Sequence, residues 1–171
     1  MFDLKELARE VGVLLRERKL TLCTVESATG GLIAGTLTEI PGSSDYYKGS
    51  IVAYSNDIKV KLAGVSPQTL SEHGAVSSLT AEEMAIGGCR ALAADICLSD
   101  TGIAGPGGAG QTKPVGLFYL GLAHGERVWH RQFEFSGSRA QNRSMATGEA
   151  LLWLREYLNA VKGACFNVTS T

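Results

Sequence analysis

The sequence predicts an α/β fold, specifically a three-layer α/β/α sandwich around a mixed, mostly parallel sheet. Apolar runs of strand length alternate with segments whose apolar residues recur at helical spacing. Turns rich in glycine and hydroxyl residues follow several of these runs, as they do at the carboxyl ends of strands in open α/β sheets. Two late strand-like runs adjoin across His124-Gly125-Glu126, and this hairpin makes the sheet mixed rather than purely parallel.

The first half of the chain predicts helix, strand, helix, strand and helix, in that order. Charged residues separate the apolar positions of the first segment, which is typical of an amphipathic helix that covers a sheet. The strands are short apolar runs that end in polar turns. The predicted elements are a helix over 2–15, strands over 22–25 and 49–54, and helices over 32–40 and 58–62.

The second half predicts a connecting segment over 65–77, a helix, a buried strand, the hairpin and a last long helix. His73 precedes a glycine turn, so we interpret it as ordering that segment, with a catalytic role as the alternative. Thr80 is the predicted N-cap of a helix that ends near Ala94, because Glu83 would complete a capping box. The later elements are strands over 95–100, 114–123 and 128–135, and a helix over 139–160.

Composition favours one globular domain. A chain of 171 residues that is 44% hydrophobic can bury a sizeable core. We expect this domain over residues 1–162 and a loose tail over residues 163–171. The net charge of −1 gives no electrostatic case for a nucleic-acid partner. No apolar run reaches the length that crosses a membrane, so we expect no membrane partner.

Cysteine usage and the amino-terminus predict a cytoplasmic protein. Cys23, Cys89, Cys97 and Cys165 form no Cys-x-x-Cys pair, so we expect reduced thiols and no zinc site. The chain starts with charged helix-forming residues rather than with a signal sequence. We therefore expect neither a metal nor another cofactor.

The stretch from Thr24 to Gly31 carries the first candidate chemistry. Here a strand enters a helix through small hydroxyl and glycine residues, which leaves backbone N–H groups unpaired beside the positive end of the helix dipole. Such a turn suits an oxyanion or a phosphate. Ser27 lies at the junction, so its hydroxyl is a candidate nucleophile, with an ordinary N-cap as the alternative.

Lys59 is the second candidate. It follows the N-cap residue types of Ser55 to Asp57, which places it in the first turn of a short helix. The dipole there disfavours a cation, which lowers the pKa of an amine and makes a neutral, proton-accepting lysine accessible. The alternative is a solvated surface lysine.

Two further stretches suit a ligand. The glycine-rich loop from Thr101 to Gly108 follows a predicted strand, where open α/β sheets bind ligands, although a flexible linker has the same composition. Arg139 lies at the predicted start of the last helix and suits a bidentate contact with a phosphate or carboxylate. Arg143 competes for that role, and a solvated helix face is the alternative for both.

Four motifs, taken together, resemble one known family. They are Glu26-Ser27-Ala28-Thr29-Gly30-Gly31, Pro41-Gly42-Ser43-Ser44, Val52-Ala53-Tyr54-Ser55-Asn56 and Thr101-Gly102-Ile103-Ala104-Gly105-Pro106. In this order they resemble the CinA carboxy-terminal domain family of competence/damage-inducible proteins, in the form of its stand-alone nicotinamide-nucleotide amidases. The resemblance covers roughly Leu4 to Leu158. Ala28 departs from the cysteine of many relatives, which is not the presumed nucleophile. The chain is too short for the amino-terminal domain to which other members are fused.

The resemblance implies hydrolysis of the carboxamide of nicotinamide mononucleotide to nicotinic acid mononucleotide and ammonia, in pyridine nucleotide salvage. It assigns Ser27 as the nucleophile with Tyr54 and Lys59 as partners, and it matches Thr101 and Arg139 to further positions of the active site. Neutral Lys59 would take the proton of Ser27 directly or through Tyr54.

Substrate contacts follow from the same hypothesis. Backbone N–H groups from Ala28 to Gly31 would hold the oxyanion. Arg139 and the Ser43-Ser44 turn would hold the phosphate, and the loop after Thr101 would wall the nicotinamide or ribose. The predicted substrate-binding residues are Ala28, Thr29, Gly30, Gly31, Ser43, Ser44, Asn56, Thr101, Gly102, Gly105 and Arg139.

Other functions remain open at this point. A non-catalytic nucleotide-binding or partner-binding module in competence or the DNA-damage response is the main alternative, and an amidase for a different carboxamide is another. We expect a homo-oligomer, because small α/β domains of this type often self-associate.

Overall fold

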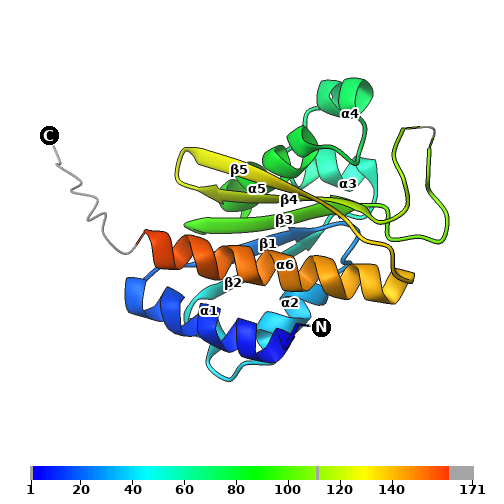
Figure 1. The fold of residues 1–171 in the computed structure, drawn as a ribbon. Coiled ribbons are helices and arrows are strands. Elements are labelled where there is room, and N and C mark those ends of the chain that lie inside the picture. The colour runs from blue at the N-terminus through cyan, green and yellow to red at the C-terminus, as the bar shows by residue number, and fades with distance from the viewer. Residues whose placement is uncertain (1, 111, 162–171) are drawn as a thin grey trace, which may run out of the picture.

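The computed structural model describes residues 2–110 and 112–161, so the predicted tail and Cys165 lie outside the described residues. A five-stranded sheet lies between two groups of helices, which confirms the predicted three-layer α/β fold (Figure 1). The strand order is β2-β1-β3-β4-β5. The strands are β1 (Leu22–Glu26), β2 (Tyr47–Val52), β3 (Ile96–Gly102), β4 (Leu117–His124) and β5 (Arg127–Glu134).

The sheet is mixed, as predicted. β1 pairs in parallel with β2 and with β3, whereas β4 is antiparallel to both β3 and β5. Four of the five strands consequently run in the same direction, and β4 alone is reversed. The tight β4–β5 turn accounts for the antiparallel pairing of these two strands, whereas β4 reverses relative to β3 through the connection over residues 103–116.

Helices cover both faces of the sheet. One face carries α1 (Leu4–Arg18), α2 (Leu32–Thr38) and α6 (Arg139–Ala160), whose apolar residues pack on Leu22, Leu98 and Leu120. The other face carries α5 (Ser78–Leu92), which packs Met84 and Ala85 against Val25 and the cysteines Cys23 and Cys97. The short elements are η1 (Ser43–Asp45), α3 (Asn56–Lys61) and α4 (Pro67–His73).

Glycines let α5 come close to its neighbours. A Cβ on Gly87 would lie 1.7 Å from the carbonyl oxygen of Ala63, in the connection after α3. A Cβ on Gly88 would lie 2.5 Å from both Cys97 Sγ and Val25 Cγ2 on the sheet. The fit of α5 between the sheet and the segment that follows α3 therefore depends on these two glycines.

The region before α5 differs from the prediction. Residues 67–73 form α4 rather than a plain connection, because Ser66 caps the helix and Pro67 occupies its first position. Ser77, and not Thr80, is the N-cap of α5, and its hydroxyl accepts the Thr80 N–H. Glu83 forms no capping box. Its carboxylate instead accepts the Ser66 N–H at 2.9 Å and the Thr69 hydroxyl at 2.7 Å.

Several strand boundaries also differ from the prediction, and β4 begins at Leu117 instead of at 114. β2 runs over Tyr47–Val52 instead of 49–54, and β3 extends through Gly102. Tyr54 and Lys59 therefore both follow the end of β2, and Thr101 belongs to a strand instead of to a loop. None of the helices in the described part of the chain combines the length and apolarity that a bilayer crossing requires.

Candidate active site

The candidate site lies where the carboxyl ends of β1, β2 and β3 meet. Because these strands are parallel, the residues that follow them reach the same edge of the sheet. A cavity of about 190 Å³ opens there. Its lining residues come from five stretches of the chain and are Ser27, Ala28, Tyr54, Asn56, Lys59, Ala75, Val76, Thr101, Gly102, Ala104 and Arg139.

Lys59 and Ser27 are in direct contact in this cavity. Lys59 is only 2% exposed, and its Nζ donates to Ser27 Oγ at 2.9 Å and to the carbonyl oxygen of Ala53 at 2.7 Å. Burial lowers the pKa of Lys59, and the negative charge of Asp100 opposes this effect. A lowered pKa was predicted, but burial is its largest cause and not the helix dipole. The lysine is therefore not a solvated surface residue.

Ser27 is not an N-cap. The helix that follows, α2, begins after Gly31, which makes no side-chain capping bond. The hydroxyl of Ser27 instead meets the buried amine, in a residue that is 8% exposed. A serine whose hydroxyl contacts a buried lysine has the arrangement of an activated nucleophile and its base.

Two buried carboxyls accept hydrogen bonds from the backbone N–H groups of the Ser27 turn and of the start of α2. Asp100 accepts the N–H groups of Ser27 at 3.1 Å, Ala28 at 2.9 Å and Thr29 at 3.1 Å. Glu26 accepts those of Gly31 at 2.9 Å, Ile33 at 3.0 Å and Ala34 at 2.8 Å. The prediction that the amides of Ala28, Thr29 and Gly31 hold an oxyanion is therefore wrong, because the protein's own carboxyls already hold these donors.

Sequence reasoning did not assign a role to either carboxyl. Glu26 appeared only as the first residue of a motif, and Asp100 only as the end of a buried strand. One signal was present in the sequence. Glu26 ends β1 just before α2, and Asp100 lies near the end of β3; an acidic residue near the start of a helix is stabilised there. Thr29, Gly30 and Gly31 consequently support the turn and do not line the cavity.

Thr29 links the two carboxyls. Its hydroxyl lies within hydrogen-bond distance of Glu26 Oε2, at 2.7 Å, and also of Asp100 Oδ1. Arg143 donates from Nε to the carbonyl oxygen of Thr29 at 3.1 Å, so this arginine supports the turn from α6. Burial raises the pKa of Asp100 to about 6, and the neighbouring Glu26 charge acts in the same direction.

Arg139 and Tyr54 form the rim of the cavity. Arg139 donates to the Tyr54 hydroxyl at 3.0 Å and to the carbonyl oxygen of Gly105 at 2.9 Å. Tyr54 is 64% exposed. Its hydroxyl is bonded to Arg139, while Lys59 reaches Ser27 without an intermediary. Gly105 contributes a carbonyl to the rim arginine and does not itself line the cavity.

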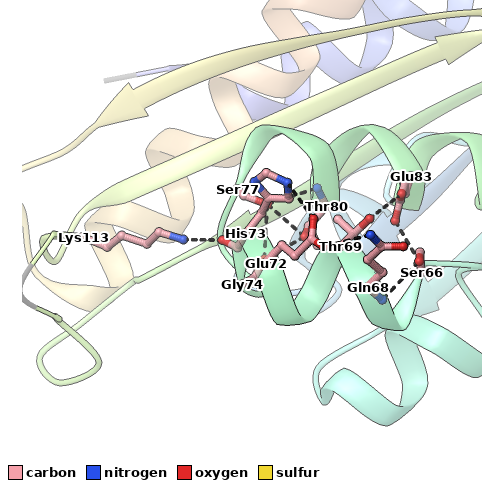
Figure 2. A network of polar contacts seen from close by, with 10 residues as sticks. All are labelled: Ser66, Gln68, Thr69, Glu72, His73, Gly74, Ser77, Thr80, Glu83 and Lys113. Carbon is pink, nitrogen blue, oxygen red and sulfur yellow. Dashed lines mark hydrogen bonds and ion pairs between the residues drawn. The ribbon is translucent and has the colours of Figure 1, made fainter.

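One wall of the cavity is the segment between α4 and α5, residues 74–77. The hydroxyl of Thr101, a buried residue, donates to the carbonyl oxygen of Ala75 at 2.6 Å. Figure 2 shows the polar network around the start of this segment, in which Thr80 donates to the carbonyl oxygen of Gly74 at 2.8 Å. Lys113 donates to the carbonyl oxygen of His73 at 2.7 Å in the same view. His73 therefore takes part through its backbone and does not line the cavity.

The predicted phosphate contacts of Ser43 and Ser44 are wrong for a single chain. Both residues lie in η1, which immediately precedes the start of β2. The start of β2 pairs with Leu22, at the amino-terminal end of β1. This turn is therefore at the opposite edge of the sheet from Ser27. Among the described residues, no group of three or more His, Cys, Asp or Glu side chains is arranged to hold a metal ion.

Comparisons with known proteins identify the family and the fold. A family model described as the CinA C-terminal domain matches residues 4–158. A putative competence-damage inducible protein of Caldicellulosiruptor bescii is 48% identical over 153 residues, which are 89% of this chain and 37% of that protein. One of Halothermothrix orenii is 49% identical over 158 residues, which are 91% of this chain and 38% of that protein. The chain thus spans well under half the length of these relatives.

Solved structures show the same fold. One is the crystal structure of a competence/damage inducible protein from Agrobacterium tumefaciens, whose sequence is 40% identical to this chain. The two superpose with a TM-score of 0.88 over 93% of this chain and 97% of that protein's chain. A CinA superfamily protein from Klebsiella pneumoniae is 28% identical with a TM-score of 0.90 and covers 93% and 99% of the two chains.

Proposed function

The chain belongs to the CinA C-terminal domain family, and from that premise we propose that it is an amidohydrolase. Its proposed reaction converts nicotinamide mononucleotide to nicotinic acid mononucleotide and ammonia in pyridine nucleotide salvage. The observation that carries the proposal is the 2.9 Å contact between Lys59 Nζ and Ser27 Oγ in a buried site.

The contact supports a covalent mechanism with one base. Neutral Lys59 takes the proton of the Ser27 hydroxyl while Oγ attacks the carboxamide carbon. Collapse of the tetrahedral intermediate breaks the C–N bond, and the Lys59 ammonium gives the proton to the departing amide nitrogen, which leaves as ammonia. Water then hydrolyses the Ser27 ester, with Lys59 taking a proton from the water and returning it to Ser27 Oγ.

Burial suits Lys59 to this role. A lysine in water is almost wholly protonated at neutral pH, and loss of solvation favours its neutral form. Its direct partners, the Ala53 carbonyl and the Ser27 hydroxyl, are both uncharged and do not hold the amine in its protonated form. The lowered pKa of Lys59 follows from this environment.

The cavity supports a division of the substrate between its floor and its rim. A volume of about 190 Å³ suits the nicotinamide ring beside Ser27 and leaves the phosphate near the mouth. Arg139 lies at that mouth, and its bonds to Gly105 and Tyr54 leave further guanidinium donors for an anion. Tyr54 and Asn56 also line the cavity, and their side chains carry hydrogen-bond donors.

The test is ammonia release from nicotinamide mononucleotide. We expect Ser27→Ala and Lys59→Met each to lower kcat by about 10³-fold or more, because residues that act as a unit fail together. Lys61→Met is the matched control, since Lys61 is two residues away on α3, exposed and paired with Asp57. Its activity should equal that of the wild type.

Other outcomes would redirect the assignment. Turnover near the wild-type rate in Ser27→Ala would contradict the covalent mechanism. Binding of the nucleotide without ammonia release by the wild type would favour the non-catalytic binding module. A panel of other carboxamides separates a different amidase specificity from no activity at all. The homo-oligomer and the cytoplasmic location stay predictions.

A further inference from the structure

We propose that Asp100 is a positioning residue of this site, which fixes the Ser27 turn with both carboxyl oxygens and whose charge sets how readily Lys59 gives up its proton. The inference deepens the proposed amidase function, and its consequences for the reaction rate rest on that function. Its consequences for Lys59 itself do not.

The first part of the inference rests on three consecutive hydrogen bonds. Asp100 is wholly buried in β3, and its Oδ1 accepts the Ser27 N–H while its Oδ2 accepts those of Ala28 and Thr29. The Asp100 carboxyl on β3 thereby fixes the backbone of the turn that follows the neighbouring strand, β1. Charged acceptors make stronger bonds than neutral ones, so the direction of the Ser27 side chain is held by this residue.

The second part rests on the position of Ser27 between the two ionisable groups. Asp100 binds the backbone amide of Ser27, and Lys59 binds the hydroxyl of the same residue. The carboxyl and the amine are thus separated by a single serine in a buried environment, where charges interact strongly. Because the direct partners of Lys59 are uncharged, the Asp100 charge favours the protonated amine without neutralising it by contact.

Other charged groups of the site lie on neighbouring elements. Glu26 lies on β1, and Arg139 and Arg143 lie on α6. β4 places Leu120 opposite Asp100, and the segment before α5 contributes the uncharged Ala75 and Val76 to the cavity. Glu26 accepts backbone N–H groups of Ile33 and Ala34 in the first turn of α2.

The Thr29 hydroxyl lies between the Asp100 and Glu26 carboxyls. The Thr29 hydroxyl has one proton but lies within hydrogen-bond distance of an oxygen of each carboxyl. Both contacts become hydrogen bonds when one of the two carboxyls is protonated and donates to Thr29 while Thr29 donates to the other. Burial raises the pKa of Asp100 in agreement with this arrangement. The charge that Lys59 faces therefore changes near neutral pH.

The test compares Asp100→Asn with the wild type by NMR titration of the Lys59 side chain, without substrate. Asparagine keeps the shape of the carboxyl and removes the charge, but it offers the Ser27 turn one acceptor oxygen instead of two. We expect the pKa of Lys59 to fall by about one pH unit, because a nearby buried carboxylate has been lost. The acid limb of the kcat/KM profile should move to lower pH by the same amount, which a purely structural role would not cause.

Asp95→Asn is the matched control. Asp95 precedes the same strand at its other end, where it accepts the Thr21 N–H at 2.7 Å, as Asp100 accepts that of Ser27. It should leave both the Lys59 titration and the acid limb unchanged.

Several results would overturn the inference. One is an unshifted Lys59 titration in folded Asp100→Asn, and another is an activity loss at every pH with the acid limb in its original place. Should that variant not fold, the wild type supplies the test: its Asp100 carboxyl carbon should titrate near neutral pH with a matching step at Lys59. Absence of that step contradicts the inference. A shifted Lys59 titration without any ammonia release would instead contradict the proposed amidase alone.

Discussion

At the scale of single residues, Lys59 shows the conflict between function and stability most clearly. A buried amine whose contacts are a carbonyl and a hydroxyl has lost its hydration without gaining a charged partner in contact. The folded protein therefore favours neutral Lys59, whereas the unfolded chain favours the ammonium.

Lys59→Met should stabilise the protein at neutral pH while it abolishes activity. The expected gain is about 1 kcal/mol, since an apolar side chain of similar length needs no hydration. The folded-state pKa of Lys59 lies below its unfolded value, so the unfolded chain binds more protons between the two values. Wild-type stability should therefore rise with pH through that interval, and the advantage of the variant should disappear near pH 10.

Urea unfolding at several pH values measures this difference. Lys61→Met again serves as the control, because Lys61 is exposed and should show no such pH-dependent gain. A Lys59→Met variant that is less stable than the wild type at neutral pH would contradict a net cost of burying this amine.

How much of the site was predictable differs from residue to residue. Ser27, Tyr54, Lys59 and Arg139 were identified from the sequence, and all four line one cavity. The amides of the Ser27 turn were misassigned, because a sequence shows free donors at a helix start but not the carboxyl that another strand brings to them. Asp100 is more than seventy positions from Ser27 along the chain.

At the scale of elements, strands were easier to predict than the short helices. Apolar runs revealed β1 and β3, since these strands are buried on both faces. α4 was missed because its seven residues contain little apolar periodicity and depend on capping at Ser66 and on Glu83. Tertiary contacts, and not local propensity, decide such a helix.

Glu83→Gln should loosen α4 from α5. The glutamate accepts the Ser66 N–H and the Thr69 hydroxyl with separate oxygens, and an amide offers only one acceptor. We expect a loss of roughly 1–3 kcal/mol in the free energy of unfolding, measured by urea denaturation.

Glu72→Gln provides the comparison on α4 itself. Glu72 is exposed and accepts a hydrogen bond from the Gln68 side chain, so its variant should lie within about 0.5 kcal/mol of the wild type. Equal effects of the two substitutions would mean that Glu83 does not join the two helices.

At the scale of the whole molecule, the hydrophobic pattern predicted the layers but not which edge each turn occupies. Alternating apolar runs and helical segments predict a sandwich, and the parallel strands predict a site at their carboxyl ends. The Ser43-Ser44 turn belongs to the same set of motifs in the sequence, yet it precedes its strand and lies at the other edge. The order of the motifs along the chain does not show at which edge of the sheet a turn lies until the strand boundaries are known.

Gly87→Ala should disturb both the packing of α5 and the site. Its Cβ would overlap the carbonyl of Ala63, a backbone atom in the connection after α3, so one of the two segments must move. We expect a loss of at least about 2 kcal/mol in stability, together with reduced activity, because α3 carries Lys59.

Gly35→Ala is the matched glycine substitution in a helix. No atom lies within 4 Å of the position of its Cβ in α2. Alanine should therefore stabilise the protein by about 1 kcal/mol through helix propensity. Thermal unfolding of both variants, with ammonia release, measures the contrast, and a Gly87→Ala variant of wild-type stability would contradict the close approach of these segments.

The inaccessible amine of Lys59 also affects how the protein can be handled chemically. Amine-reactive reagents act on lysines that reach solvent, such as Lys61, whose side chain is 67% exposed, whereas Lys59 is enclosed beneath its serine. Coupling through surface lysines to a resin, or to a reagent too large for the cavity of about 190 Å³, should therefore spare this group, and the immobilised protein should retain its proposed base.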